Sequence, residues 1–434
     1  MGNNMVKTVF TGKPVVGFYP LFYNLAETGR AILVAKRFIE LGGKAVFFSH
    51  GGKYEYLAKE LGYEIVQIKP IYTEESITKI IKINRGEQKG IAYDESFLRE
   101  AVKEEIAAYI KKEVELVVSF VNIPCSISAR AANIPLICVS PAPGNFYLKI
   151  PDNFENNFTR LIPQSLKVPV LNLCFNKSKK FLKPFNIVAR EYHLRPFKST
   201  MDVVYGDVTL GTNFLEFINV FPNQQLFSDE DYVGIISLEE VFSERFSEEN
   251  AKAIEHEFTQ HLKKSEKSIL LTMGSSGDNK FFLNILNALN KTNYRVIAIY
   301  ASILNEDELP SFNENILLMK FAPSIQKLHK MADLTIMHGG QGTVYAAAYA
   351  GKPIIGFPMQ FEQHLNLEKM VGHGLGLMLS RKYFREKHLF NAIKEIFDNY
   401  EIYLKNAQKL AKKLPKPEGD KKAARRIAEI LQKK

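Results

Sequence analysis

Two glycine-containing turns in the second half of the chain have the composition of phosphate-binding loops. The first, Gly274–Gly277, follows the apolar run SILLT, and the second, His338–Thr343, follows LTIM; each precedes a stretch of helical periodicity. Small residues between a strand and a helix let an anion approach backbone N–H groups at the positive end of the helix dipole. Taken alone, the first turn is equally compatible with an ordinary strand-to-helix connection. Because the second turn repeats the pattern, the two together predict a diphosphate held by two helix N-termini without a metal ion.

The order of the apolar runs determines where these turns lie. In the first third, apolar runs such as Lys44–Ser49 and Val114–Phe120 alternate with amphipathic stretches such as Gly29–Gly42. The alternation starts again at Ser268–Thr272, after a charged region over 236–266. This alternation predicts an α/β protein with parallel sheets covered by helices. Ligands of such sheets bind at the carboxyl ends of the strands, so we expect two doubly wound halves with both glycine turns at one such edge.

The composition is that of a globular protein with two domains. The chain has 434 residues, of which 46% are hydrophobic, and a chain of this length exceeds one ordinary core. No apolar run approaches the roughly 18 residues that span a bilayer, and the N-terminal residues lack the pattern of a signal peptide. The three cysteines have no metal-ligand spacing. We therefore expect a cytoplasmic protein without a structural metal or a disulfide framework.

The net charge of +10 is concentrated in two segments. The segment 405–434 carries +8 and the segment 176–200 carries +6, which leaves −4 for the rest of the chain (10 − 8 − 6). No nucleic-acid-binding motif accompanies either segment, so nucleic acid is the least favoured partner. In the segment 176–200 the cations alternate with the aromatic residues Phe181, Phe185, Tyr192 and Phe197. Two interpretations stay open for this segment: peripheral contact with an anionic membrane surface, or a solvated helix whose aromatic residues pack in the core.

One block around the second glycine turn resembles a known family. The block runs from Phe321 to Gly376 and reads FAPSIQKLHKMADLTIMHGGQGTVYAAAYAGKPIIGFPMQFEQHLNLEKMVGHGLG. It resembles the donor-nucleotide signature of the family 1 UDP-glycosyltransferases, which have the GT-B fold: two doubly wound, Rossmann-like domains that face a central crevice. The resemblance implies an acceptor-binding domain over 1–240, a nucleotide-sugar-binding domain over 241–415, and a last helix over 416–434 that crosses back to the first domain.

The resemblance also implies roles for individual residues. Phe321 would stack on the uracil ring, where the family usually has Trp, and the backbone of Ala322 would contact the base. The diphosphate would be bound by residues of the two glycine turns: Gly274, Ser275, His338, Gly340, Gly342 and Thr343. Glu362 and Gln363 would bind the sugar hydroxyls. The sequence departs from the family at Ala346, where a Glu commonly binds the ribose, and at Ser324, where Gln is frequent; both departures weaken the expectation of a uridine donor.

The first half would supply the catalytic base. In the resembled family this base is usually a His eight residues before an Ala of the first helix, and here that position holds Glu27. A Glu can act as a general base if burial raises its pKa, but Glu27 could equally cap the helix that follows. His50, after the apolar run Lys44–Ser49, and Asn122, after Val114–Phe120, are candidates for the acceptor side, as is Ser126.

The sequence thus predicts an inverting, metal-independent glycosyltransferase that moves a sugar from a UDP-sugar to the hydroxyl of a lipid or a small molecule. It would use no cofactor beyond the UDP-sugar co-substrate. The missing His and the missing ribose-binding Glu leave open a catalytically inactive protein that binds sugar nucleotides. A UDP-sugar epimerase with the same fold is a third interpretation, which fits the donor signature less well.

Overall fold

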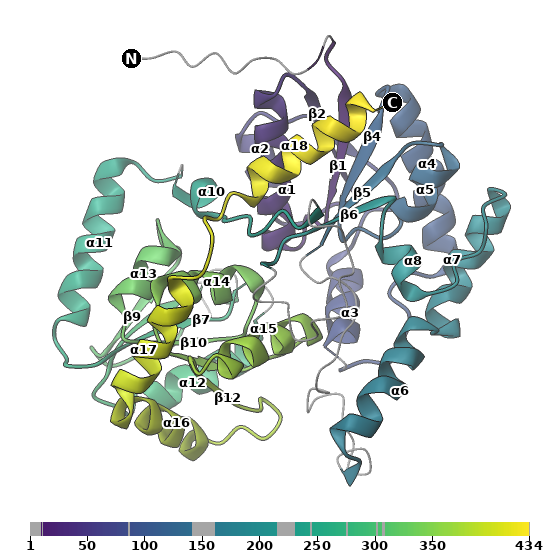
Figure 1. Ribbon diagram of the computed structural model, residues 1–434. Helices are drawn as coiled ribbons and strands as arrows, with labels where there is room; N and C mark the ends of the chain where they lie inside the picture. The colour runs from purple at the N-terminus through teal and green to yellow at the C-terminus, as the bar shows by residue number, and fades with distance from the viewer. Residues whose placement is uncertain are drawn as a thin grey trace. The chain divides into compact units, whose positions relative to one another are not determined.

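The computed structural model describes residues 10, 12–85, 87–140, 161–214, 231–243, 245–274, 277–300, 303–305 and 309–433. The chain divides into two compact units (Figure 1). The first unit consists mainly of the residues before Ser237 together with Pro417–Lys434, and the second mainly of Leu238–Lys416. Within the described residues, no helix is both long enough and apolar enough to cross a membrane.

The first unit is built on a six-stranded, fully parallel sheet with the strand order β3-β2-β1-β4-β5-β6. Its strands are β1 (Val15–Pro20), β2 (Lys44–Ser49), β3 (Ile65–Gln67), β4 (Leu116–Phe120), β5 (Leu136–Ser140) and β6 (Val208–Gly211). Its helices are α1 (Leu25–Glu40), α2 (Glu55–Glu60), α3 (Glu74–Asn84), α4 (Glu95–Lys111), α5 (Cys125–Ala131), α6 (Gln164–Asn176), α7 (Lys179–Glu191), α8 (Thr200–Val204) and α18 (Gly419–Gln432).

The second unit repeats this topology with the strand order β12-β11-β10-β7-β8-β9, again fully parallel. Its strands are β7 (Ser268–Thr272), β8 (Arg295–Ile299), β9 (Ile316–Met319), β10 (Leu334–Met337), β11 (Ile354–Gly356) and β12 (Gly376–Met378). Its helices are α10 (Glu239–Ser243), α11 (Glu248–Leu262), α12 (Asn279–Leu289), α13 (Ile325–Met331), α14 (Gln341–Ala350), α15 (Phe361–Gly372), α16 (Glu386–Asp398) and α17 (Tyr400–Ala411). The two sheets confirm the predicted fold class of doubly wound, parallel α/β halves.

The central strands are apolar on both faces because helices cover both sides of each sheet. Every residue of β4, β5, β7 and β10 is buried. In each sheet the strand order reverses between the first strand and the fourth, which are β1 and β4 in one unit and β7 and β10 in the other. Such a reversal leaves a crevice at the carboxyl ends of the two strands, where doubly wound folds bind ligands. These two positions are therefore where we look for functional residues.

The last helix, α18, belongs to the first unit and lies beside α1 (Figure 1). Its small apolar face, Ala423, Ala424, Ile427 and Ala428, is buried. Two ion pairs hold its charged face: Arg37 Nε lies 2.7 Å from Asp420 Oδ2, and Arg426 Nε lies 3.1 Å from Asp231 Oδ1. Part of the basic C-terminal segment thus pairs with acidic groups of the first unit.

The basic segment 176–200 contains α7 and the loop that leads from α7 to α8. Phe185 and Phe197 are buried in the core of the first unit, and Phe181 and Tyr192 are half-buried against the same cluster. Of the two interpretations that the sequence left open, the structure therefore favours the solvated helix for the aromatic residues. Phe185 and Phe197 are therefore not available to a membrane, whereas the Lys and Arg residues of this segment are exposed.

Candidate functional site

In the second unit, the two predicted phosphate loops meet at the reversal of the strand order. β7 and β10 are parallel neighbours with Thr272 opposite Met337, so the loops after them start side by side. Gly274 has φ +58°, and a Cβ on it would lie 2.7 Å from Cε1 of His338. The imidazole of His338 is 4% exposed and packs directly against the Gly274 backbone. Two loops that are 64 residues apart in the sequence (338 − 274) thus form one surface.

The helix that follows His338 begins without a side-chain cap. Gly340 is the N-cap residue of α14 and makes no side-chain hydrogen bond to the first turn. The neighbouring helices α12 and α13 are capped, by Asp278 at 2.8 Å from Phe281 N and by Ser324 at 3.1 Å from Lys327 N. The first N–H groups of any helix have no partner within the helix. In α14 these N–H groups, beside the His338 imidazole, have the chemistry that binds a phosphate.

Two positions of this loop hold glycine for different reasons. A Cβ at Gly340 would lie 2.5 Å from Nε2 of His338, so packing within the protein requires glycine there. A Cβ at Gly342 would meet no protein atom within 4 Å. Its missing side chain therefore leaves open space at the start of α14, next to the half-buried Thr343. Ser275 of the first loop lies outside the described residues.

The loop after β11 carries the pair that the sequence predicts to bind a sugar, and the two residues are placed differently. Gln363 is 1% exposed, and its Oε1 accepts hydrogen bonds from the backbone N–H groups of Met359 (2.9 Å) and Gln360 (3.2 Å). The Gln363 side chain thus caps the start of its own helix, α15. The oxygen that we expected to bind a sugar hydroxyl is already occupied by these two hydrogen bonds. Glu362 is half-buried at the same helix start, so of the pair it is the better placed to receive a hydroxyl group.

Asn366 is a residue of this site that the sequence reasoning missed. It is 6% exposed, and its Nδ2 donates both to the carbonyl of Gly339 (3.0 Å) and to Oε1 of Glu362 (2.6 Å). One amide therefore fixes the phosphate loop and the predicted sugar-binding carboxylate relative to each other. The spacing of four residues from Glu362 within a helix was the signal that could have revealed it.

Phe321 and Ala322 follow β9, the edge strand of the second sheet. The ring of Phe321 is half-buried, and the guanidinium of Arg245 lies 6.0 Å from its centroid. Ala322 packs against the small apolar cluster beneath α11 and α13. Neighbouring strands lie about 4.8 Å apart. Along the carboxyl edge the strands follow in the order β11, β10, β7, β8, β9. The predicted sugar contact follows β11, the predicted diphosphate contacts follow β10 and β7, and the predicted base contact follows β9. This is the order of the same parts in a nucleotide sugar.

In the first unit, Glu27 lies in the first turn of α1 at the reversal point between β1 and β4. It is 5% exposed, and its Oε1 lies 2.5 Å from Nη2 of Arg30. Burial raises the pKa of the Glu27 carboxyl, and the Arg30 guanidinium offsets part of that rise. Asn24 is the N-cap residue and accepts from Ala26 N at 3.0 Å, so Glu27 is not the cap. Its Oε2 is buried without a hydrogen-bond partner among the described residues.

Two more unpartnered oxygens lie in the β4–α5 connection and in the first turn of α5. β4 pairs with β1 up to Phe120, and Val121 bridges Pro20, so this connection starts beside the one that leads to Glu27. Oδ1 of Asn122 and Oγ of Ser126 are buried and, within the described part of the chain, make no hydrogen bond. A buried polar atom without a partner is costly. A ligand or a water molecule that supplies donors here would remove that cost.

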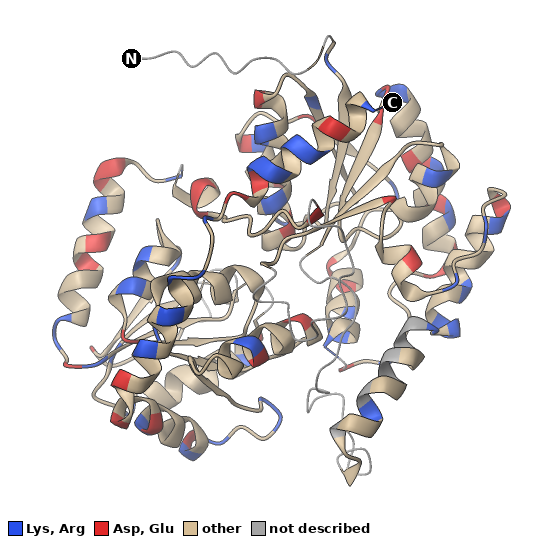
Figure 2. Cartoon of the chain, in the orientation of Figure 1, with Lys and Arg blue, Asp and Glu red and all other residues tan. Residues whose placement is uncertain are grey.

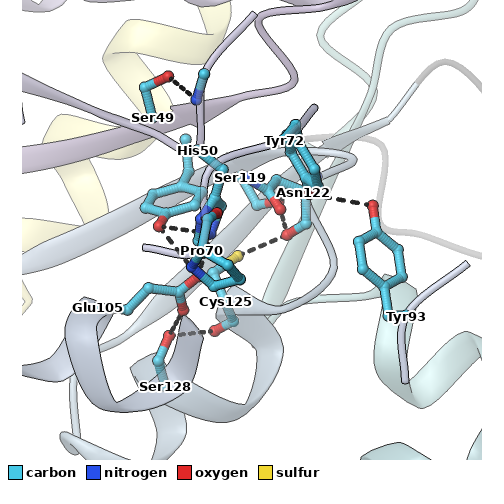
Figure 3. A network of polar contacts seen from close by, with 12 residues as sticks. Ser49, His50, Pro70, Tyr72, Tyr93, Glu105, Ser119, Asn122, Cys125 and Ser128 are labelled. Atoms are coloured by element: carbon cyan, nitrogen blue, oxygen red, sulfur yellow. Dashed lines mark hydrogen bonds and ion pairs between the residues drawn. The ribbon is translucent and has the colours of Figure 1, made fainter. Parts of the chain in front are cut away.

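His50, which the sequence analysis proposed for the acceptor side, lies in a buried hydrogen-bond network. Its imidazole is fully buried: Nδ1 lies 2.9 Å from the Pro70 carbonyl and Nε2 lies 3.1 Å from Oε1 of Glu105 (Figure 3). Tyr19 donates to the same Glu105 oxygen at 3.0 Å, and Ser128 donates to the other. Since a carbonyl only accepts, the His50 nitrogen that contacts Pro70, Nδ1, carries a hydrogen.

Both ring nitrogens of His50 are therefore used in contacts within the protein, and neither is left to bind an acceptor. Burial, followed by the nearby Glu105 carboxylate, raises the pKa of Tyr19 well above its ordinary value. The sequence reasoning missed Glu105. Its signal was a carboxylate on the apolar face of α4, between Ala101 and Tyr109, which are both buried.

The comparisons with known proteins agree with this geometry. Residues 243–427 match the model of the glycosyltransferase family 28 C-terminal domain. The solved structures of a spinosyn forosaminyltransferase and of the calicheamicin glycosyltransferase superpose with TM-scores of 0.63 and 0.63, at 15% and 13% identity. Each superposition covers 98% of this chain, and it covers 100% and 98% of the other chain. The chain is a glycosyltransferase of the GT-B fold.

Curated relatives of this chain have names that describe sugar transfer. A PGL/p-HBAD biosynthesis glycosyltransferase of Mycobacterium tuberculosis is 24% identical over 341 residues, which are 77% of this chain and 74% of the relative. A PGL/p-HBAD biosynthesis rhamnosyltransferase of Mycobacterium bovis is 24% identical over 334 residues, 74% and 69% of the two chains. An uncharacterized UDP-glucosyltransferase of Bacillus subtilis is 24% identical over 289 residues, 63% and 71%.

Proposed function

We propose that this glycosyltransferase moves a hexose from a UDP-sugar to an acceptor hydroxyl, with inversion at the anomeric carbon and without a metal ion. The observation that carries the proposal is the contact of Gly274 with His338 beside the uncapped start of α14. This contact brings the two glycine loops together at the reversal point of the second sheet. The uncapped N-terminus of α14 and the His338 imidazole would stabilise a diphosphate by the positive end of the helix dipole and by hydrogen bonds.

The donor is proposed to be a uridine nucleotide for two reasons. Phe321 occupies the edge-strand end at which the base of a nucleotide sugar would lie, and one relative is named a UDP-glucosyltransferase. Ala346, which replaces the ribose-binding Glu expected from the family resemblance, is 8% exposed. It offers no hydrogen bond, so the ribose would be bound by other groups. Glu362, held by Asn366, would accept hydrogen bonds from the sugar hydroxyls.

Glu27 is proposed as the general base. In a single displacement the acceptor oxygen forms a bond to the anomeric carbon while the bond to the UDP oxygen breaks, and the hydroxyl proton leaves to a base. Oε1 of Glu27 is bound to Arg30, whereas Oε2 is buried without a partner among the described residues and is free to take that proton. The Arg30 guanidinium stabilises the ionised form that catalysis needs, against the burial that raises the pKa.

The acceptor would lie at the reversal point of the first sheet, with Asn122 and Ser126 as its polar contacts. The relatives named for PGL/p-HBAD biosynthesis support a lipid or a phenolic small molecule as the acceptor class. His50 would not contact the acceptor; its Nδ1 would position the Pro70 carbonyl by a hydrogen bond.

The experiment that tests this function is a transfer assay with UDP-glucose and a panel of lipid and small hydroxyl acceptors in the presence of EDTA. We expect UDP release and, by proton NMR, a β-linked product from the α-linked donor. Glu27→Gln should lower kcat by about 100-fold or more, because general-base catalysis contributes about 10²–10⁴. UDP binding without release under any condition, in wild type and variant alike, would identify a sugar-nucleotide-binding protein instead.

A further inference from the structure

The helix α6 exposes an apolar face to solvent. Leu166, Val170 and Leu173 are 64%, 58% and 57% exposed, and their spacing of four and three residues places them on one side of the helix. Pro169 and Cys174 are exposed on the same side. Just before the helix, Leu161 is 83% exposed. The other large hydrophobic residues exposed among the described residues occur singly, as is normal for a protein surface, so the cluster on α6 calls for an explanation.

The charged residues of the segment that contains this face are all basic. The segment 161–190 contains six Lys and Arg residues and no Asp or Glu. Lys177, Lys179, Lys180 and Lys183 follow α6 and are all exposed. The apolar side of α7, including Phe185, is buried in the core of the first unit, so these lysines stand on its outer side. In Figure 2 the ribbon of α6 is mostly tan or grey, whereas the region of α7 has several blue Lys and Arg positions.

An aliphatic stripe next to clustered cations, with no carboxylate between them, is the composition of a helix that lies in the interface of an anionic bilayer. We propose that α6 lies on such a membrane surface, with Leu166, Val170 and Leu173 inserted among the lipid chains. The lysines at the start of α7 contact the anionic headgroups. This assignment goes beyond the transfer reaction, because no donor-binding or catalytic residue takes part, and it stands if the proposed function fails. In this proposal the apolar residues that contact the membrane belong to α6, and not to the aromatic residues of 176–200.

Cys174 allows a direct test without new cysteines. Cys125 and Cys138 are buried and Cys174 is exposed, so an environment-sensitive thiol dye labels the apolar face of α6. Vesicles of phosphatidylcholine alone and of phosphatidylcholine with phosphatidylglycerol serve as probes. We expect a blue shift of the dye, and flotation of the unlabelled protein, with the anionic vesicles only. Raising the salt concentration should weaken both, because salt screens exposed charges.

Two groups of variants separate the apolar and the electrostatic contributions to vesicle binding. Leu166→Gln/Val170→Gln/Leu173→Gln should abolish flotation, whereas the control Ile110→Gln should not, although Ile110 is 71% exposed. Each of Lys177→Gln, Lys179→Gln and Lys180→Gln should lower the partition coefficient by about fivefold. Equal flotation of the triple Gln variant and wild type would overturn the proposal.

Two further results would also overturn it. A dye that is already blue-shifted in buffer and does not respond to vesicles would mean that the protein itself covers this face. A concentration-dependent dimer in sedimentation velocity, lost in the triple Gln variant and without vesicle binding, would assign the face to a second copy of the chain.

Discussion

The imidazole of His338 fills the space that a Cβ on Gly274 would need, at 2.7 Å from its Cε1. Because Gly274 also has φ +58°, Gly274→Ala is disfavoured both by the backbone and by the contact. We expect it to lower the free energy of unfolding by about 1–3 kcal/mol and to weaken UDP binding by displacing His338. Urea unfolding and a UDP titration of the same variant measure the two effects. Unchanged UDP affinity would separate the first loop from the donor site.

Gly342→Ala tests the open space at the start of α14 without disturbing the protein. A Cβ there meets no protein atom within 4 Å, so stability should stay the same or rise. UDP affinity should fall by at least about tenfold, since a lost hydrogen bond to a charged group costs about 1.5–3 kcal/mol. Gly372→Ala is the matched control, because its Cβ also meets nothing and it lies at the far end of α15. Wild-type UDP binding by Gly342→Ala would show that no ligand occupies this space.

Asn366→Ala should act on the donor through two groups at once. It removes the hydrogen bonds that hold the Gly339 carbonyl and Glu362. We expect the KM for the UDP-sugar to rise by about tenfold or more, at about 1–3 kcal/mol for each buried group left unpaired. Asn406→Ala is the control, because Asn406 also donates to a glycine carbonyl, that of Gly374, but does so on α17. Equal KM values for both variants would remove Asn366 from the site.

The pH dependence of transfer should reveal the Glu27–Arg30 pair. Burial raises the pKa of Glu27 and Arg30 lowers it, so Arg30→Gln should raise the pKa further. Since the base acts when ionised, the acidic limb of kcat/KM against pH should move to higher pH in Arg30→Gln and stay near its wild-type position in Arg30→Lys. Stability has the opposite dependence: a raised carboxyl pKa stabilises the fold at low pH, and this stabilisation is lost as the pH rises through the pKa of the folded state. An acidic limb that does not move would exclude Glu27 as the base.

The buried network around Glu105 should contribute to stability and little to chemistry. Glu105→Ala leaves His50 and Tyr19 without their shared acceptor in a fully buried place. Breaking such a pair costs about 3–5 kcal/mol, which urea unfolding would detect. Glu100→Ala, on an exposed position of the same helix, should change stability little. A small loss of unfolding free energy in Glu105→Ala would contradict this, because it would mean that His50 and Tyr19 find other hydrogen-bond partners.

The sequence predicted those features that depend on local pattern. The two glycine loops were recognisable because the same pattern of small residues stands between a strand and a helix in both, and the strand order brings Gly274 to His338. The pair Glu27–Arg30 was not predicted, although its spacing of three residues within one helix was a usable signal. The pair His50–Glu105 was not predicted because it depends on which side of α4 meets the end of β2. Gln363 was expected at the sugar, yet a Gln three residues after an N-cap Gln can satisfy its own helix start.

The measurement that tests the central claim most directly is a thermal-unfolding titration with UDP, dTDP, GDP and ADP, on wild type and on His338→Ala. A nucleotide at 100 times its dissociation constant adds about 2.7 kcal/mol to stability, which shifts the midpoint visibly. We expect UDP to stabilise the wild type selectively, and His338→Ala, folded without ligand, to lose this response. No response of the wild type to any nucleotide would contradict a donor site formed by Gly274, His338 and the start of α14.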